Sequence, residues 1–371
     1  MKKFKVCFKY VKCFWKKVKN MKKICVIGAF GFEEKPTGGQ PVKSRTLYYE
    51  LVNKYGTDCV SFVDTYKWRK RPLRMICGII KNAACANVFI MLPAHNGVKV
   101  FSKMLYSLKR IKKIKIFYSV IGGWLPELLA EDNRLVAKLK KFDGVWVETS
   151  SMKDDLEKLG FCNVDVVRNF KRLKILKEDT LCFNAELPIS VCTFSRVTQK
   201  KGIGDAIAAV CKINKERGSD VIKLDIYGEI DEGYRTDFLK MVSQAKNCVR
   251  YMGVVKPEDS VNTIKSYFAL LFPTHFFTEG IPGTIIDAYS AGVPVVAPFW
   301  KNYSDVLLDK KTGYGYEFGD ANGLYNILCS VIAEPKQILE MKKTCLEYAA
   351  KYTPEVAMDR INDLLVLEEV N

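Results

Sequence analysis

The sequence predicts an α/β protein made of two doubly wound parallel-sheet domains that face each other across a cleft. Short, wholly apolar segments alternate with amphipathic helical patterns, which is typical of parallel strands covered on both faces. A polar stretch without clear periodicity, 171–186, interrupts this alternation, and the same pattern then starts again. A length of 371 residues also suits two domains of about 100–200 residues each.

The first domain is expected to begin with a buried strand at Ile24–Gly28, a glycine-containing loop to Gly39 and an amphipathic helix from about Val42 to Tyr55. Later apolar runs predict further strands, with helical patterns between them. These strands are Asp58–Val63, Val88–Leu92, Ile114–Val120, Val145–Glu148 and Val164–Val167.

The second domain repeats the arrangement. Its expected strands are Ile189–Phe194, Val221–Tyr227, Val249–Val254, Phe268–Phe272 and Pro294–Ala297, and its expected helices include Ile203–Arg217, Arg235–Gln244 and Ile285–Ala291. The predicted division is a basic segment 1–20, a first domain 21–170, a linker 171–186, a second domain 187–340, and C-terminal helices 341–371 that pack back toward the first domain. Two such domains place a ligand-binding cleft between the carboxyl ends of their sheets.

Composition excludes several classes of protein. With 48% hydrophobic residues the chain can bury sizeable cores, so it is not disordered throughout. It contains no apolar run of about 18 residues that could cross a membrane and no signal-peptide core. Its 13 cysteines are scattered singly, without a C-x-x-C pair, which argues against a disulfide framework or a zinc site and fits a reducing cytosol.

The charge is concentrated in the first half. Residues 1–170 hold 34 Lys and Arg against 14 Asp and Glu, a net of +20, whereas residues 171–371 hold 25 against 27, a net of −2. Such asymmetry favours an anionic partner for the first half, such as nucleic acid, a membrane surface or a phosphorylated substrate. A lysine-rich solvated surface is the simpler alternative.

Residues 1–20 form the most basic segment. Apolar residues recur there at helical spacing among the lysines, namely Phe4, Phe8, Val11, Trp15 and Val18. This pattern is typical of a helix lying in a membrane interface, and it predicts a cytoplasmic protein held at the inner face of the membrane. A disordered tail, or translation starting at Met21, are the alternatives. If the segment is an anchor, deleting residues 1–20 should release the protein from anionic liposomes and leave donor hydrolysis intact.

Three groups of residues are candidates for a binding site. Gly38 and Gly39 precede a helix and would allow backbone to approach an anion, although the loop is not the G-x-G-x-x-G dinucleotide motif. Arg196 and Lys201 follow a strand and precede the next helix, where two cations suit a diphosphate. The third group is a Gly/Pro loop and helix, 278–297, that carries Glu279 and Asp287.

This third block resembles the retaining family-4 glycosyltransferases, which have the two-Rossmann-domain GT-B fold. The family pattern E-G-F-P-x-x-x-x-E-A-x-A-x-G-x-P-V-V-A is similar to Glu279–Ala297, with Asp287 in place of the second Glu. The family element G-R-x-x-x-x-K-G is similar to Ser195–Gly202, the early glycine pair to Gly38–Gly39, and the linker entry to Val166–Asn169. The resemblance covers residues 21–371.

The resemblance implies roles for these residues. Arg196 and Lys201 would hold the diphosphate of a nucleotide sugar, without a metal; the chain contains no D-x-D triplet. Glu279 would accept hydrogen bonds from the donor sugar and Asp287 from the ribose. Donor binding would also involve Gly38, Gly39, Ile281, Gly283 and Thr284. The family often has a histidine in its first domain, and His95 is the candidate here; His275, before the Glu279 loop, could also line the pocket.

The sequence therefore predicts a hexosyltransferase (EC 2.4) that moves a sugar, with retention, from a nucleotide donor to a glycan or lipid-linked acceptor. The implied context is assembly of a capsule, O-antigen or exopolysaccharide at an anionic membrane surface, with no cofactor and no nucleic acid as partner. The alternatives are a basic polyanion- or nucleic-acid-binding protein without catalysis, or another GT-B enzyme such as a phosphorylase or an epimerase. An aromatic platform among the basic residues, which a nucleic-acid binder would need, is not evident.

Overall fold

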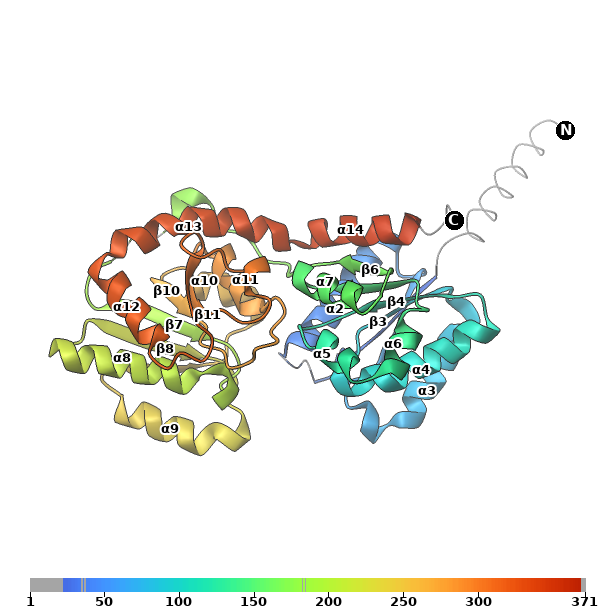
Figure 1. Ribbon diagram of the computed structural model, residues 1–371, viewed down its shortest axis with the longest axis horizontal. Coiled ribbons are helices and arrows are strands. Elements are labelled where there is room, and N and C mark those ends of the chain that lie inside the picture. The colour runs from blue at the N-terminus through green and yellow to red at the C-terminus, as the bar shows by residue number, and fades with distance from the viewer. Residues whose placement is uncertain (1–22, 35, 37, 182, 184, 368–371) are drawn as a thin grey trace.

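The computed structural model describes residues 23–367 except Lys35, Thr37, Cys182 and Asn184 (Figure 1). The predicted amphipathic segment 1–20 therefore lies outside the described residues. Each of the eleven apolar runs expected above as a strand forms a parallel β-strand, and the strands assemble into two six-stranded sheets.

The first sheet has the order β2-β1-β3-β4-β5-β6. Its strands are β1 (Ile24–Gly28), β2 (Val60–Asp64), β3 (Val88–Met91), β4 (Lys115–Ser119), β5 (Gly144–Val147) and β6 (Val164–Val166). The helices between them are α2 (Gly39–Tyr55), α3 (Pro72–Cys85), α4 (His95–Ile111), α5 (Leu125–Ala130), α6 (Asn133–Leu139) and α7 (Ser150–Lys158). Every residue of β1 and β3 is buried, because helices cover both faces of the sheet.

Helix α2 begins three residues before the expected Val42. Proline lacks a backbone N–H, but the N–H groups of a helix's first turn have no partner within the helix, so Pro41 is compatible with a start at Gly39. Gly38 and Gly39 are consequently the N-cap and first residue of a helix, rather than a loop that precedes it.

The second sheet has the order β12-β11-β10-β7-β8-β9. Its strands are β7 (Ile189–Phe194), β8 (Ile222–Tyr227), β9 (Val249–Gly253), β10 (Ala269–Leu271), β11 (Val295–Pro298) and β12 (Gly313–Tyr316). Its helices are α8 (Ile203–Arg217), α9 (Arg235–Gln244), α10 (Ser260–Ile264), α11 (Gly283–Ser290), α12 (Gly323–Ala333) and α13 (Pro335–Ala349). Strand β12 was not predicted because Gly313 and Gly315 interrupt any apolar run.

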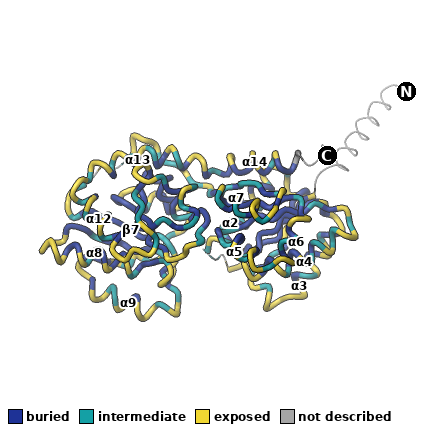
Figure 2. Tube along the Cα trace, in the orientation of Figure 1, coloured by how far each residue is buried: buried dark blue, intermediate teal, exposed yellow. Residues whose placement is uncertain are grey.

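The last helix, α14 (Pro354–Leu367), extends from the second domain across to the first (Figure 1). Its buried residues, among them Met358 and Ile361, join Leu47 and Leu51 of α2 in covering one face of the first sheet. Helices α3 to α7 cover the opposite face. Figure 2 shows the resulting pattern, with buried strands inside and exposed helix faces outside.

The described part of the chain has no disulfide bond, no cluster of metal ligands and no membrane-spanning helix. Its cysteines are free thiols, and no group of three or more His, Cys, Asp or Glu side chains could hold a metal ion. No helix between residues 23 and 367, the four gaps aside, is long and apolar enough to cross a membrane.

Candidate functional site

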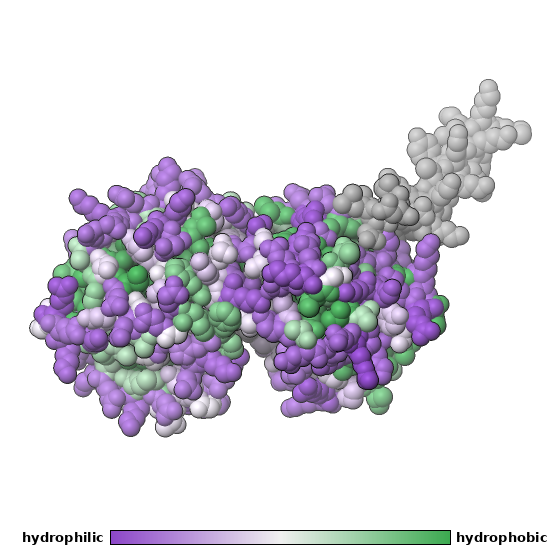
Figure 3. Space-filling model, in the orientation of Figure 1, coloured by the Kyte–Doolittle hydropathy of each residue, from purple (hydrophilic) through white to green (hydrophobic). Residues whose placement is uncertain are grey.

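A cavity of about 350 Å³ lies between the domains, at the carboxyl edges of both sheets. We call it the interdomain cavity, and the space-filling view shows a notch between the two lobes (Figure 3). In the second domain it lies where the strand order reverses, between β7 and β10, which is where doubly wound sheets bind ligands. The predicted site residues Gly38, Gly39, Arg196, Lys201, Glu279, Ile281, Gly283, Thr284 and Asp287 all line it, and His95 does not.

Glu279 and Lys201 form an ion pair in the wall of the cavity that the second domain provides. Lys201 Nζ donates a hydrogen bond to Glu279 Oε1, which also accepts from Thr274 Oγ1 at 3.0 Å. Lys201 further lies over the ring of Phe272, 5.1 Å from its centroid. Both charged side chains are largely buried, with 20% and 16% of their surfaces exposed. One carboxylate oxygen, Oε2, is left to accept from a ligand.

The backbone after Lys201 accounts for its position. Gly202 has φ +67°, and a Cβ at this position would lie 1.7 Å from the carbonyl oxygen of Pro273. A glycine is therefore required for the 199–201 turn to pass directly against the segment that follows β10. This close approach brings a cation from the end of β7 next to the loop that carries Glu279.

Arg196 follows β7 and is more loosely held. Its Nη2 lies 3.0 Å from Asp231 Oδ2, and 57% of its side chain is exposed. A surface ion pair of this kind contributes little to stability. Arg196 is consequently free to exchange Asp231 for a more highly charged anion in the cavity.

The first residues of α11 also line the cavity on its second-domain side. The first N–H groups of a helix have no partner within it and attract anions, so Gly283 and Thr284 present donors there. Thr284 Oγ1 is buried and has no hydrogen-bond partner among the described residues. Asp287, one turn further along, accepts from Lys171 Nζ at 2.5 Å and from Ser260 Oγ at 2.9 Å, both at Oδ1.

The first-domain wall contains a buried ion pair. Lys43 of α2 donates to Glu148 Oε1 at 2.6 Å and to the carbonyl oxygen of Val120 at 3.1 Å; the two side chains are 3% and 2% exposed. Glu148 also accepts at Oε2 from the backbone N–H of Ile281, 3.0 Å away in the other domain. The Ile281 amide, a predicted donor-binding group, is therefore already occupied by Glu148. The four cations lining the cavity, Lys43, Lys171, Arg196 and Lys201, are each paired with a carboxylate.

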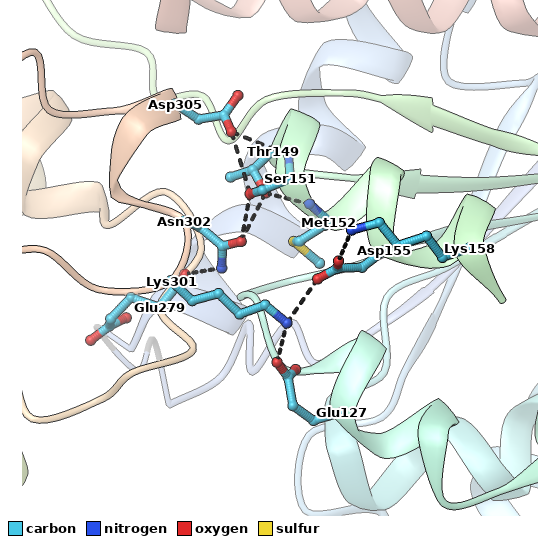
Figure 4. Close-up of polar contacts among 10 residues, drawn as sticks. All are labelled: Glu127, Thr149, Ser151, Met152, Asp155, Lys158, Glu279, Lys301, Asn302 and Asp305. Atoms are coloured by element: carbon cyan, nitrogen blue, oxygen red, sulfur yellow. Dashed lines mark hydrogen bonds and ion pairs between the residues drawn. The ribbon is translucent and has the colours of Figure 1, made fainter.

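The domains also meet along a polar seam beside the cavity (Figure 4). Asn302 donates to the carbonyl oxygen of Glu279 at 2.6 Å and accepts from Ser151 Oγ at 2.7 Å. Asp305 accepts from the Ser150 N–H at 3.0 Å, which places a negative charge at the N-terminus of α7, where it is favourable. The seam joins the backbone of Glu279 to the first domain.

Lys301 completes the seam with ion pairs to Glu127 at 2.5 Å and Asp155 at 2.8 Å. Burial alone would raise the pKa of Asp155, but hydrogen bonds from Lys301 and Lys158 outweigh it and lower the pKa. For Lys301, burial would lower the pKa, and the two carboxylates outweigh it and raise the pKa. Both shifts favour the charged forms of this interdomain pair.

Neither histidine lines the interdomain cavity. His95 begins α4 and lines a second cavity in the first domain, with its ring centroid 5.1 Å from that of Trp124. His275 Nε2 lies 2.6 Å from Asp205 Oδ2 at the surface. Neither ring contacts the Glu279 carboxylate.

Sequence reasoning missed Lys43, Glu148, Lys171 and Asn302. Glu148 could have been found, because it closes the predicted strand Val145–Glu148 at the sheet edge where ligands bind. Lys43, Lys171 and Asn302 carry no such signal, since their partners are 105, 116 and 23 residues away in sequence.

Comparison with known proteins finds related sequences and similar folds. Residues 188–334 match the family model "Glycosyl transferases group 1". A curated relative, the amylovoran biosynthesis glycosyltransferase AmsK of Erwinia amylovora, is 27% identical over 146 residues, which are 38% of this chain and 35% of that protein. The match thus spans about a third of the length of that relative.

Solved structures resemble nearly the whole chain. Sucrose-phosphate synthase of Thermosynechococcus elongatus superposes with a TM-score of 0.76 at 16% identity, covering 94% of this chain and 100% of that one. Anabaena HepE in complex with UDP and glucose gives 0.72 at 13% identity, covering 93% and 99%. The GT-B fold predicted from the sequence is confirmed. The group 1 match lies within the predicted second domain, 187–340.

Proposed function

We propose that this protein is a retaining glycosyltransferase of the family-4 type, which moves a sugar from a nucleotide-sugar donor to a glycan or lipid-linked acceptor. The observation that carries the proposal is the interdomain cavity, which Arg196, Lys201, Glu279 and the start of α11 line together, with Lys201 bonded to the Glu279 carboxylate. Further support is that HepE, of the same fold, has been solved with UDP-glucose, and that AmsK is named for amylovoran biosynthesis. Surface polysaccharide assembly is the proposed context.

In this proposal the diphosphate of the donor lies between Arg196, Lys201 and the first amides of α11. A lysine ammonium has three donors, so Lys201 can hold Glu279 and a phosphate oxygen at once. As the bond from the anomeric carbon to the diphosphate oxygen breaks, negative charge grows on the leaving group. Fixed cations and helix N–H groups stabilise that charge without reorganising.

Glu279 and Asp287 would orient the two ends of the donor. Glu279 Oε2 accepts from hydroxyls of the transferred sugar, which fixes the sugar relative to the leaving group. Asp287 Oδ1 already has two donors, Lys171 and Ser260, so Oδ2 is the oxygen that accepts from the ribose. Ser260 and Lys171 thus hold the shorter aspartate in place of the family's glutamate.

The test is donor binding and turnover. Thermal shift with UDP, GDP, ADP and CMP, followed by hydrolysis of the matching nucleotide sugars, identifies the donor. Arg196→Ala should weaken binding of the nucleoside diphosphate, while Arg217→Ala, an exposed arginine outside the cavity, should not. NMR of the product's anomeric proton checks retention. The proposal fails if no nucleotide stabilises the protein and no nucleotide sugar is turned over.

We also propose that the first domain contacts an anionic membrane surface, as an enzyme on the cytoplasmic side with a lipid-linked acceptor would. Helix α3 supports this. Its exposed apolar side chains Leu73 and Ile80, 76% and 65% exposed, share an outer surface with Arg74 and Lys81. Sedimentation with anionic liposomes should fall in a Leu73→Gln/Ile80→Gln variant; unchanged sedimentation would refute this contact.

A further inference from the structure

A second cavity, of about 400 Å³, lies in the first domain next to the interdomain cavity. Its walls come from the segments that follow β1, β2 and β3, at Ala29, Thr65–Lys70 and Pro93–Gly97. This is the carboxyl edge of the sheet where the strand order reverses, between β1 and β3, so its position is that of a ligand site. We call it the basic cavity.

The charge of its lining is one-sided. Lys67, Arg69 and Lys70 line the basic cavity together with His95, and no aspartate or glutamate does. Lys67 pairs with Glu34 outside the lining. Arg69 and Lys70 are exposed and form no ion pair with any described residue. The interdomain cavity differs, since a carboxylate already neutralises each of its cations. Two uncompensated cations beside a third favour a multiply charged anion.

The basic cavity is close to the proposed site of transfer. Gln40 lines it, whereas the preceding residues Gly38 and Gly39 line the interdomain cavity. On another side, the His95 ring lies against Trp124, and the nearby Gly122 lines the interdomain cavity. A ligand held by the basic cavity could therefore extend a hydroxyl group past these residues toward the donor sugar.

We propose that the basic cavity binds a phosphate or diphosphate group carried by the acceptor, through Arg69 and Lys70, while the acceptor's sugar faces the interdomain cavity. This inference rests on the proposed function and adds the chemical class of the acceptor, a glycosyl phosphate or diphosphate. The aromatic side chains Tyr66 and Trp68 in the same lining provide apolar surface for the part of the acceptor next to its charged group.

The test uses the full chain with saturating UDP in the interdomain cavity, titrated calorimetrically with three probes: inorganic pyrophosphate, glucose 1-phosphate, and an isoprenyl diphosphate in detergent micelles. The site variant is Arg69→Ala/Lys70→Ala. The matched control is Arg110→Ala/Lys113→Ala, which removes two exposed cations of the same domain outside the cavity. The affinity for pyrophosphate should fall about tenfold or more in the site variant and stay within twofold in the control.

The comparison of probes separates the two sources of the phosphate. Tighter binding of the isoprenyl diphosphate assigns the cavity to a lipid-linked acceptor, and tighter binding of glucose 1-phosphate assigns it to a soluble one. The proposal is overturned if no probe binds, or if the site variant and the control lose the same affinity. UDP affinity is measured first in each variant and should not change in the site variant, because Arg69 and Lys70 do not line the interdomain cavity. If the proposed function fails, the wild-type protein will not bind UDP.

Discussion

Asn302 is expected to act as a positioning residue that couples contact between the domains to the placement of Glu279. Its side chain is fully buried and holds the Glu279 carbonyl oxygen at 2.6 Å and Ser151 Oγ at 2.7 Å. A longer contact, 3.4 Å, joins it to Thr149 Oγ1. An Asn302→Ala substitution removes all three and leaves the Glu279 carbonyl without that donor.

The size of the effect follows from these contacts. A buried polar group left without its partner costs about 1–3 kcal/mol. Ser151 Oγ has other acceptors nearby, Thr149 Oγ1 at 3.2 Å and Asp305 at 3.4 Å, so the loss falls mainly on the Glu279 carbonyl. If about 1.4–2.8 kcal/mol of that loss appears in the transition state, kcat falls about 10- to 100-fold.

The assay separates positioning from general destabilisation. We expect kcat for the nucleotide sugar to fall in Asn302→Ala while the Kd for the nucleoside diphosphate stays nearly unchanged, because Arg196 and Lys201 are untouched. Ser151→Ala, which removes only the first-domain contact, should lower kcat less. Asn326→Ala, at an exposed asparagine of α12, is the matched control and should leave both constants unaltered.

A folded Asn302→Ala protein, with a cooperative thermal transition and a kcat within twofold of the wild type, would contradict this role for Asn302. Equal losses in kcat and in diphosphate affinity would also count against it, because they would indicate a collapsed cavity rather than a misplaced Glu279.

Four further outcomes are expected. Glu279→Gln keeps the shape of the side chain but loses its charge, so turnover should drop about 10- to 100-fold; near-normal turnover in the folded variant contradicts its assignment. Activity should survive excess EDTA, and a loss restored by Mg²⁺ or Mn²⁺ would overturn the role given to fixed cations. The lowered pKa of Asp155 contributes stability at pH values above the ordinary pKa of an aspartate, and this contribution is lost as the pH falls through the lowered pKa. The raised pKa of Lys301 contributes stability at pH values below the ordinary pKa of a lysine, and this contribution is lost as the pH rises through the raised pKa. The difference in unfolding free energy between wild type and Lys301→Met should therefore be flat from about pH 5 to about pH 9 and shrink toward acid, and a slope within that window would argue against the pair. In Gly280→Ala the new Cβ would lie 2.2 Å from Glu148 Oε2, so the domains should separate, and an unchanged radius of gyration by small-angle scattering would refute this.

Eleven of the twelve described strands and the second-domain half of the site can be predicted from local sequence patterns. Buried parallel strands are apolar on both faces, so runs such as Ile24–Gly28 and Ile189–Phe194 can be recognised as strands before their neighbours in the sheet are known. Gly283 and Asp287 are also predictable, because a spacing of four residues places them on the same side of one helix, and Glu279 lies in the loop just before that helix. Strand β12 cannot be predicted in this way, because its alternating glycines and tyrosines resemble a turn.

The pairing of side chains in the cavity walls and between the domains depends on the tertiary structure. Lys43 and Glu148, Lys171 and Asp287, and Asn302 and Ser151 are pairs between elements far apart in the chain, and no local periodicity encodes which of them come together. The same holds for His95, whose place in the basic cavity depends on how β1, β2 and β3 end side by side. Local sequence fixes backbone conformation and burial through short-range sterics and hydrophobicity, whereas the pairing of polar side chains in the cavity walls is set by the packing of elements that are distant in sequence.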